Sequence, residues 1–300
     1  MREDNPYSVF RIPYSVFRIP YSAAIIHYSL FTIPYSLFPI HYSLFTIHYS
    51  LFTIIMFPTL NIGPLAFPTT GLVIIFGAYL CLTLAEKSAI RLRQNHIALY
   101  SLATTGLVAG FVGARLAFVI EYWAAFQENL LGIVWPLNTG YNTWVGLLIS
   151  VAAMFFYGRF KQLPPAQTLD ALAPALITGL MVVSLADFLG GPGLGTLTSV
   201  PWGIPQFGIR RHAVQLYELI TGASALLLWW QLSKQQRKAG QLFWGVTAVY
   251  SAGRLFFDAY RADAWLTANG YHILQIIMLI ILLMSLFLLG LINPFPTADN

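Results

Sequence analysis

Residues 271–292 read YHILQIIMLIILLMSLFLLGLI, a segment without a single aspartate, glutamate, lysine or arginine. A helix that crosses a membrane needs about 20 mostly apolar residues, so this segment predicts one. The rest of the chain has the same character, because 57% of its 300 residues are hydrophobic and only 9% are charged. Soluble domains usually carry a charged share of about 25%. The composition therefore predicts an integral membrane protein.

Seven segments meet the same criterion of length and apolar composition. They lie near residues 69–85, 97–122, 141–157, 171–189, 213–232, 240–258 and 271–292. The predicted fold is therefore an all-α, polytopic membrane protein with about seven transmembrane helices. Loops 85–96, 158–170 and 233–240 are rich in lysine and arginine, and they alternate with loops that are poor in lysine. The positive-inside rule then places these loops and the C terminus in the cytoplasm, and the mature N terminus outside.

The first 55 residues repeat a seven-residue unit with almost no variation. The dipeptide Tyr-Ser recurs at positions 7, 14, 21, 28, 35, 42 and 49. A coiled coil is excluded, because its helix would be broken by Pro13, Pro20, Pro34 and Pro39. We interpret residues 1–55 as a tandem repeat that is not part of the native protein. Translation of the native protein would then start at Met56. Residues 56–300 are then predicted to form a single membrane domain.

Ionisable side chains fall inside the predicted spans, as Arg115, Asp187, Glu218, Arg254 and Asp258. Such side chains are costly in a bilayer and normally face a partner or a water-filled cavity. Two interpretations are open. The residues mark a functional site, or they pair only to hold helices together, Arg115 with Glu218 and Arg254 with Asp258.

The decamer RRHAVQLYEL, residues 210–219, brings charge next to an apolar segment. Polar residues recur at i, i+4 and i+7, here as Arg211, Gln215 and Glu218, and again as Arg254, Asp258 and Arg261. On helices this spacing puts each set on one face, so two polar stripes can face one pocket. Guanidinium groups suit a phosphate through paired hydrogen bonds, and His212 or a carboxylate can move a proton. The spacing predicts an outward-facing site for an anionic lipid or a phosphate.

Several other classes of site are excluded by what the sequence lacks. Outside the repeats its histidines are His96, His212 and His272, which stand alone in the sequence, and Cys81 is its single cysteine. The sequence has no metal-ligand spacing, Walker loop or Gly-x-Ser-x-Gly nucleophile. No metal or other cofactor is therefore predicted. The basic residues are explained by the loops, so a nucleic acid partner is not predicted either.

From Met56 onward the sequence resembles the bacterial prolipoprotein diacylglyceryl transferases. Four segments carry the resemblance: MFPTLNIGPLAFPTTGLVI at 56–74, GARLAFVIEYW at 113–123, RHAVQLYE at 211–218 and GQLFWGVTAVYSAGRLFFDAYRAD at 240–263. They occur in the order that is usual for the family. The resemblance implies a multi-pass protein of the bacterial inner (plasma) membrane.

The resemblance also implies a reaction and its partners. The diacylglyceryl group of phosphatidylglycerol would pass to the lipobox cysteine thiol of an exported prolipoprotein, among membrane lipids and without a cofactor. The implied phosphate- and lipid-binding residues are Arg115, Arg211, Arg254, Arg261, Gln215 and Tyr217. A thiol attacks as thiolate, so a base must take its proton. The implied candidates for that base are His212, Glu218 and Asp187.

Four positions depart from the family pattern. Trp144 stands at a motif histidine, Ser184 at an arginine, Asp187 at an asparagine and Pro192 at a glutamate. Two hypotheses follow. The protein is a divergent transferase in which Asp187 or another of the three candidates takes the proton, or it is a non-catalytic relative that binds lipid or a membrane partner. A small transporter fits less well, because the chain lacks inverted repeats.

Overall fold

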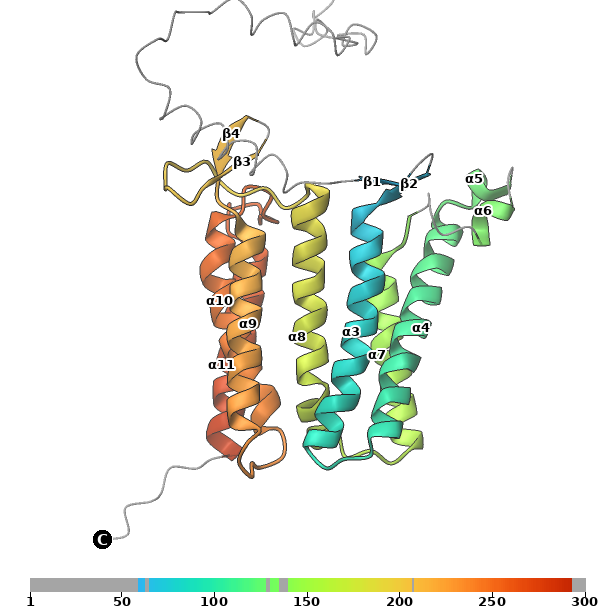
Figure 1. The fold of residues 1–300 in the computed structure, drawn as a ribbon, viewed down its shortest axis with the longest axis vertical. Coiled ribbons are helices and arrows are strands. Elements are labelled where there is room, and N and C mark those ends of the chain that lie inside the picture. Colours follow the sequence, from blue (N-terminus) through green and yellow to red (C-terminus); the bar gives the residue numbers. More distant parts are fainter. Residues whose placement is uncertain (1–58, 63–64, 128–129, 135–139, 207, 293–300) are drawn as a thin grey trace, which may run out of the picture. The chain divides into compact units, whose positions relative to one another are not determined.

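The computed structural model describes residues 59–62, 65–127, 130–134, 140–206 and 208–292, all within one compact unit (Figure 1). The predicted repeat at 1–55 and the predicted start at Met56 lie outside the described residues. The long helices of the described part are α3 (Thr69–Arg91), α4 (His96–Glu121), α7 (Thr143–Phe160), α8 (Pro165–Gly190), α9 (Val214–Leu232), α10 (Gln241–Phe257) and α11 (Ile273–Ile292). Each overlaps one predicted span, which confirms the predicted all-α architecture.

The helices differ in how apolar they are. By length and hydropathy alone, α3, α4, α7, α8 and α11 are able to cross a membrane. The other two, α9 with 19 residues and α10 with 17, carry Gln215, Glu218 and Arg254. Gln215 and Glu218 do not face lipid, because they are 1% and 5% exposed, and the side chain of Arg254 is 12% exposed. These three side chains are therefore turned into the helix bundle.

Large apolar side chains cover the outside of the bundle. Phe160 on α7 is 80% exposed and Phe287 on α11 is 66% exposed. Many other large apolar side chains on α3, α4 and α11 are exposed as well. Soluble monomers rarely expose contiguous apolar surface of this kind. The outer surface therefore matches the hydrocarbon region of a bilayer, as the composition predicted.

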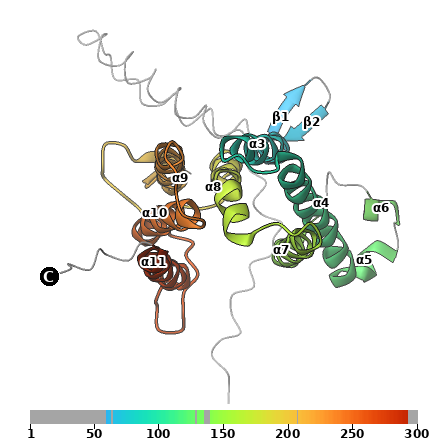
Figure 2. The same ribbon diagram turned by 90° about the horizontal axis from the view of Figure 1, so that it is seen from below.

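Helix α8 lies between two groups of helices (Figure 2). On one side α3 packs against α8 and α4 packs against α7, and on the other side α9 and α10 pack against α8 and α11 packs against α10. The α4–α7 contact is close because it is lined by glycine. A side-chain carbon on Gly146 would collide with Ala114 and the Gly110 carbonyl.

Local sequence sets where the helices begin and end. The side-chain oxygens of Asn95 and Asn142 accept hydrogen bonds from the first turns of α4 and α7. Gly191, with φ of 96°, ends α8 in a left-handed conformation. Two boundaries were predicted wrongly. Helix α3 continues six residues beyond 85 to Arg91, and α8 begins at Pro165 rather than 171, because hydropathy truncates polar turns that are still good helix formers.

One end of the bundle carries short elements that the sequence did not predict. Here lie the antiparallel hairpins β1 (Thr59–Ile62) with β2 (Leu65–Pro68), and β3 (Ile204–Gln206) with β4 (Ile209–Arg211), together with α5 (Trp123–Gln127), α6 (Leu131–Val134) and η1 (Asp258–Tyr260). The turns after α3, α7 and α9, which hold the predicted basic loops, lie at the other end (Figure 1). The decorated end and the basic end are therefore opposite ends of the same helices.

Candidate active site

Three ionised side chains meet at the decorated end of α9 and α10. Glu218 Oε1 forms an ion pair with Arg254 Nη1 and another, 2.8 Å long, with Arg261 Nη1. Ser184 on α8 donates its hydroxyl to Glu218 Oε2 over 2.5 Å. Helix α8, helix α9, helix α10 and the segment after η1 thus converge on one carboxylate. We call Glu218, Arg254, Arg261 and Ser184 the Glu218 cluster.

The Glu218 cluster is buried and carries more cations than anions. The side chains of Arg254 and Arg261 are 12% and 16% exposed. A second carboxylate, Asp263, lies 3.1 Å from Arg261 Nε, but it is 44% exposed and its charge is screened by solvent. Two guanidinium groups in a largely dry site, with one buried carboxylate between them, are suited to receive a further anion.

Asp187 lies beside the Glu218 cluster on the same helix as Ser184. The two residues are three apart in α8 and so share a helix face. Asp187 is near enough to Arg254 and Arg261 to interact with their charges. Its carboxylate makes no hydrogen bond within the described part of the chain, whereas both oxygens of Glu218 are engaged. Asp187 is thus the less committed of these two carboxylates.

The decamer contributes to the site differently from the prediction. Arg211 ends β4 and α9 begins only at Val214, so the predicted common helix face holds for Gln215 and Glu218 but is wrong for Arg211. Arg211 Nη1 donates to the Gly195 carbonyl over 3.0 Å, and its buried Nε has no partner among the described residues. The structure therefore brings Glu218, Arg254 and Arg261 together and places Arg211 next to the adjoining loop.

That loop, residues 191–199, is fastened over the start of α9. Gln215 Nε2 donates to the carbonyls of Pro192 and Gly193, over 2.8 and 2.5 Å. The Thr196 amide donates to the Tyr260 carbonyl over 2.8 Å. Gly195 lies directly against the His212 backbone carbonyl, where any side chain would collide. The loop is therefore a close-packed lid on the cluster and has no room for larger residues at Gly195.

His212 and Tyr217 form an aromatic group beside the loop. His212 Nδ1 lies 3.0 Å from the Tyr217 hydroxyl, which also accepts a hydrogen bond from Trp202 Nε1 over 3.0 Å. The His212 ring packs against Tyr260, with ring centroids 4.6 Å apart. Tyr260 belongs to η1, just before Arg261. The position of His212 is thus coupled to the segment that carries Arg261.

Arg115 lies away from the Glu218 cluster, near the end of α4. Its Nε donates to the Ile133 carbonyl over 2.9 Å, its Nη1 to Gly140 over 3.0 Å, and its Nη2 to Gly132. The alternative that Arg115 pairs with Glu218 is therefore wrong, because Arg115 is bound to backbone carbonyls around α6. The described residues show no direct ion pair between Arg254 and Asp258, because Arg254 binds Glu218 and Asp258 binds His272.

An apolar cavity of about 350 Å³ opens between α8, α10 and α11. Its walls include Leu176 and Leu180 of α8, Val246 of α10 and Met278 of α11. Arg254, the one charged residue of its lining, is the same arginine that binds Glu218. An apolar cavity with a cation at one side is complementary to a lipid that carries a phosphate.

The sequence was compared with known proteins. The family model for "Prolipoprotein diacylglyceryl transferase" matches residues 58–291. The chain belongs to the prolipoprotein diacylglyceryl transferase family. Among its relatives are two proteins named phosphatidylglycerol–prolipoprotein diacylglyceryl transferase. The one from Geobacter sulfurreducens is 29% identical over 244 residues, 77% of this chain and 91% of its own length. The one from Staphylococcus aureus (strain Newman) is 24% identical over 241 residues, 76% of this chain and 86% of its own length.

The structure shows the contacts of Ser184 and Trp144, two positions at which the sequence analysis expected a departure from the family pattern. Ser184 donates to Glu218, and the cations of the cluster are Arg254 and Arg261. Trp144, in the first turn of α7, stacks on Trp265, with ring centroids 6.3 Å apart and planes inclined by 16°. Trp144 therefore connects α7 to the segment between η1 and α11.

One buried polar pair at this end of the bundle was not predicted from the sequence. His272 Nδ1 lies 3.1 Å from Asp258 Oδ2, and Asp258 is 1% exposed. His272 looked isolated because its partner is 14 residues away along the chain. A signal existed nonetheless: Asp258 ends one predicted span and His272 begins the next, so both had to lie at the same end of adjacent helices.

Proposed function

We propose that this protein transfers the diacylglyceryl group of phosphatidylglycerol to the lipobox cysteine thiol of an exported prolipoprotein. A carbon–sulfur bond forms at the glyceryl carbon, and the bond between that carbon and the phosphate oxygen breaks. Glycerol phosphate leaves, and the thiol proton passes to a base. The two relatives named above carry this activity in their names.

The proposal rests on the observation that Arg254 belongs to two features of the structure at once. It lines the apolar cavity between α8, α10 and α11, and it belongs to the Glu218 cluster. Acyl chains that lie in the cavity would bring the lipid phosphate to Arg254 and Arg261. Negative charge develops on the departing phosphate, and fixed cations in a site with little water lower the barrier to its departure.

Asp187 is our preferred base among the three predicted candidates. Both oxygens of Glu218 are engaged, so Glu218 orients the two arginines. His212 is partnered by Tyr217 through Nδ1. The Asp187 carboxylate is uncommitted and lies close to the arginines that would hold the phosphate. A base in that place can receive the proton of a thiol that approaches the same lipid.

In the proposed reaction the remaining predicted residues hold other parts of the site in place. Arg211 and Gln215 hold the loop over the cluster through the carbonyls of Gly195, Pro192 and Gly193. Tyr217 sets the orientation of His212. Arg115 holds α6 against the end of α4, where an acceptor peptide would arrive from outside the membrane.

The activity is tested by complementation. The full chain is expressed in bacteria depleted of their own transferase, and the mass of a reporter lipoprotein is followed. We expect a diacylglyceryl mass shift that Arg254→Ala reduces at least a hundredfold and that Arg210→Ala leaves intact, since Arg210 is exposed and outside the cluster. A well-inserted protein that gives no mass shift would refute the proposal.

The second candidate function is lipid binding without transfer. The replacement of the motif histidine by Trp144 and of the motif arginine by Ser184 favours it. This alternative predicts that phosphatidylglycerol co-purifies with the protein and that Arg254→Ala releases it, with no mass shift of the reporter in either case. The two functions therefore give different results in one set of strains.

We also propose an orientation in the bacterial plasma membrane. The decorated end faces outward, where prolipoproteins emerge, and the basic end faces the cytoplasm, in keeping with the positive-inside rule. In a Cys81→Ser background, an impermeant maleimide should label Ser199→Cys in intact spheroplasts. The same reagent should label Gln236→Cys only after permeabilisation. The reverse pattern would overturn the orientation.

A further inference from the structure

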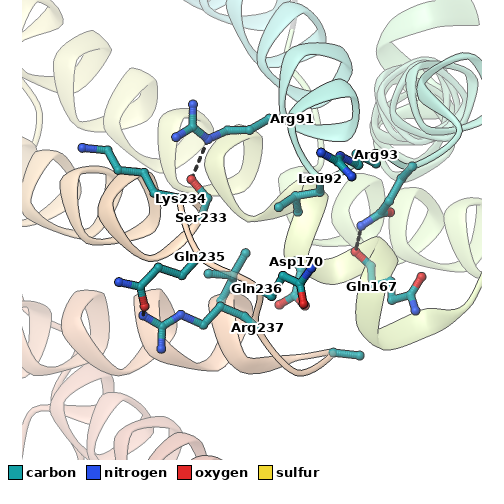
Figure 3. A pocket seen from close by; sticks show the side chains of 13 residues that line it. Arg91, Leu92, Arg93, Gln167, Asp170, Ser233, Lys234, Gln235, Gln236 and Arg237 are labelled. Carbon is teal, nitrogen blue, oxygen red and sulfur yellow. Dashed lines mark hydrogen bonds between the residues drawn. The ribbon is translucent and has the colours of Figure 1, made fainter.

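A second cavity, of about 500 Å³, lies at the basic end of the bundle (Figure 3). It is formed by the end of α3, the first turns of α8 and the turn between α9 and α10. Its lining includes the cations Arg91, Arg93, Lys234 and Arg237. Helix α9 separates the Glu218 cluster from this turn, by about 21 Å along its axis from Glu218 to Leu232. The cavity is therefore distinct from the candidate active site.

The four cations of this cavity, which we call the basic cavity, lack an anionic partner. None of them forms an ion pair with a described residue. The one carboxylate in the lining, Asp170, is committed elsewhere. Its Oδ2 accepts the Gly240 amide over 2.7 Å and its Oδ1 accepts the Phe243 amide over 2.8 Å, so it caps the start of α10. The positive charge of the cavity is thus left uncompensated.

Neutral contacts hold three of these cations in place. Arg91 Nε donates to Ser233 Oγ over 2.7 Å, which ties the end of α3 to the end of α9 (Figure 3). The ammonium of Lys234 lies 3.7 Å from the centre of the Trp230 ring. Arg237 donates to the Gln235 side chain over 2.7 Å. Each of these contacts leaves donors over for a ligand, because guanidinium has five N–H groups and ammonium has three.

We propose that the basic cavity binds a phosphate group, carried by the headgroup of an anionic phospholipid or by a free phosphate ion. Arginine forks match phosphate oxygens, and basic pockets between helices at the membrane edge recognise lipid headgroups. A lipid would lay its glycerol backbone against the apolar part of the lining, Leu92 and Leu242. The bound phosphate would join α3 to the turn between α9 and α10.

The test measures binding and needs no transferase activity. The full-length protein in neutral detergent is titrated with phosphatidic acid, and bound lipid is counted by native mass spectrometry. The variant is Arg91→Gln with Arg237→Gln. The matched control is Lys87→Gln, which removes a cation from the same helix, one turn from Arg91 and outside the cavity. Thermal unfolding of each variant verifies that it is folded.

We expect the double variant to bind phosphatidic acid at least tenfold more weakly than wild type, and Lys87→Gln to bind it like wild type. Phosphatidylcholine should bind weakly to all of them. Competition by millimolar inorganic phosphate would assign the cavity to a free ion, and its failure would assign it to a lipid headgroup. Equal binding by wild type and double variant overturns the proposal, as does an equal loss in Lys87→Gln.

A second measurement applies if the double variant does not fold. In wild type, raising the salt to about 0.5 M should weaken phosphatidic acid binding severalfold, because such salt screens charges beyond a few ångströms. Lys234→Gln, which leaves the Arg91 contacts intact, should reduce binding further in low salt. Binding that is indifferent to both changes would also overturn the proposal.

Discussion

Neutralising the carboxylate of the Glu218 cluster should destabilise the protein strongly. Glu218→Gln keeps the shape of the side chain, and an amide oxygen can still accept from Ser184. The substitution leaves the buried guanidinium groups of Arg254 and Arg261 without their shared anion. Removing one partner of a buried ion pair costs about 3–5 kcal/mol. For a domain of this size each kcal/mol lowers the melting temperature by about 2–4 °C, so we expect a loss of about 6–20 °C.

The structure supplies a matched control for this experiment. Asp263 also binds Arg261, at 3.1 Å, but its side chain is 44% exposed. Exposed pairs contribute about 0–1 kcal/mol, so Asp263→Asn should lower the melting temperature by no more than a few degrees. Both variants are measured by thermal unfolding in the same detergent. Similar shifts for Glu218→Gln and Asp263→Asn would refute the reasoning that burial sets the cost.

A double-mutant cycle separates the ion pair from other effects. Arg254→Met removes the cation and keeps an apolar side chain of comparable length. If Glu218 and Arg254 interact directly, the double variant should be more stable than the sum of the single losses predicts, by about 1–3 kcal/mol. Additive losses would show that the two residues stabilise the fold independently, contrary to the geometry.

Other expected results test the base, the loop and the missed pair. Asp187→Asn restores the amide that the family pattern has at this position, yet we expect it to abolish the mass shift of the reporter lipoprotein while the protein stays folded; retained activity would exclude Asp187 as the base. Gly195→Ala should lower the melting temperature by several degrees, because the new carbon meets the His212 carbonyl, whereas Gly290→Ala, which points into open space, should not. His272→Gln should destabilise by about 1–3 kcal/mol because it disturbs the buried Asp258 carboxylate, and a second change, Asp258→Asn, should recover part of that loss in the same melting assay.

The sequence was sufficient to predict the helices because the bilayer imposes a simple rule on them. An apolar run of about 20 residues has few other stable states in a membrane. The rule fails where a helix leaves the apolar region. The last turns of α3 and the first turns of α8 are too polar for hydropathy to detect them. The backbone is nevertheless helical as far as Arg91 in α3 and from Pro165 onward in α8.

The site was predicted in part, for a related reason. Spacing along one helix placed Gln215 and Glu218 correctly, because side chains three apart share a face. It misplaced Arg211, since strand β4 interrupts the periodicity just before α9. It gave no information on the partners of Arg115, whose guanidinium binds the backbone carbonyls of Gly132 and Ile133 in α6 and of Gly140. Every residue has a backbone carbonyl, so the sequence does not indicate which carbonyls will accept a hydrogen bond from an arginine.

The ion pair between α9 and α10 has a consequence for how the chain enters the membrane. An aspartate, lysine or arginine at the centre of a transmembrane helix opposes insertion by about 2.5–3.5 kcal/mol, and a charged residue nearer the helix end, such as Glu218 or Arg254, opposes it less. Helix α9 alone carries Glu218 and helix α10 alone carries Arg254, and neither is among the helices that are apolar enough to span by themselves. Side by side, joined by the turn that follows Leu232, they present a pair without net charge. We therefore expect the arrival of α10 to favour the partition of α9 from the translocon into lipid, so that the two helices insert as one hairpin.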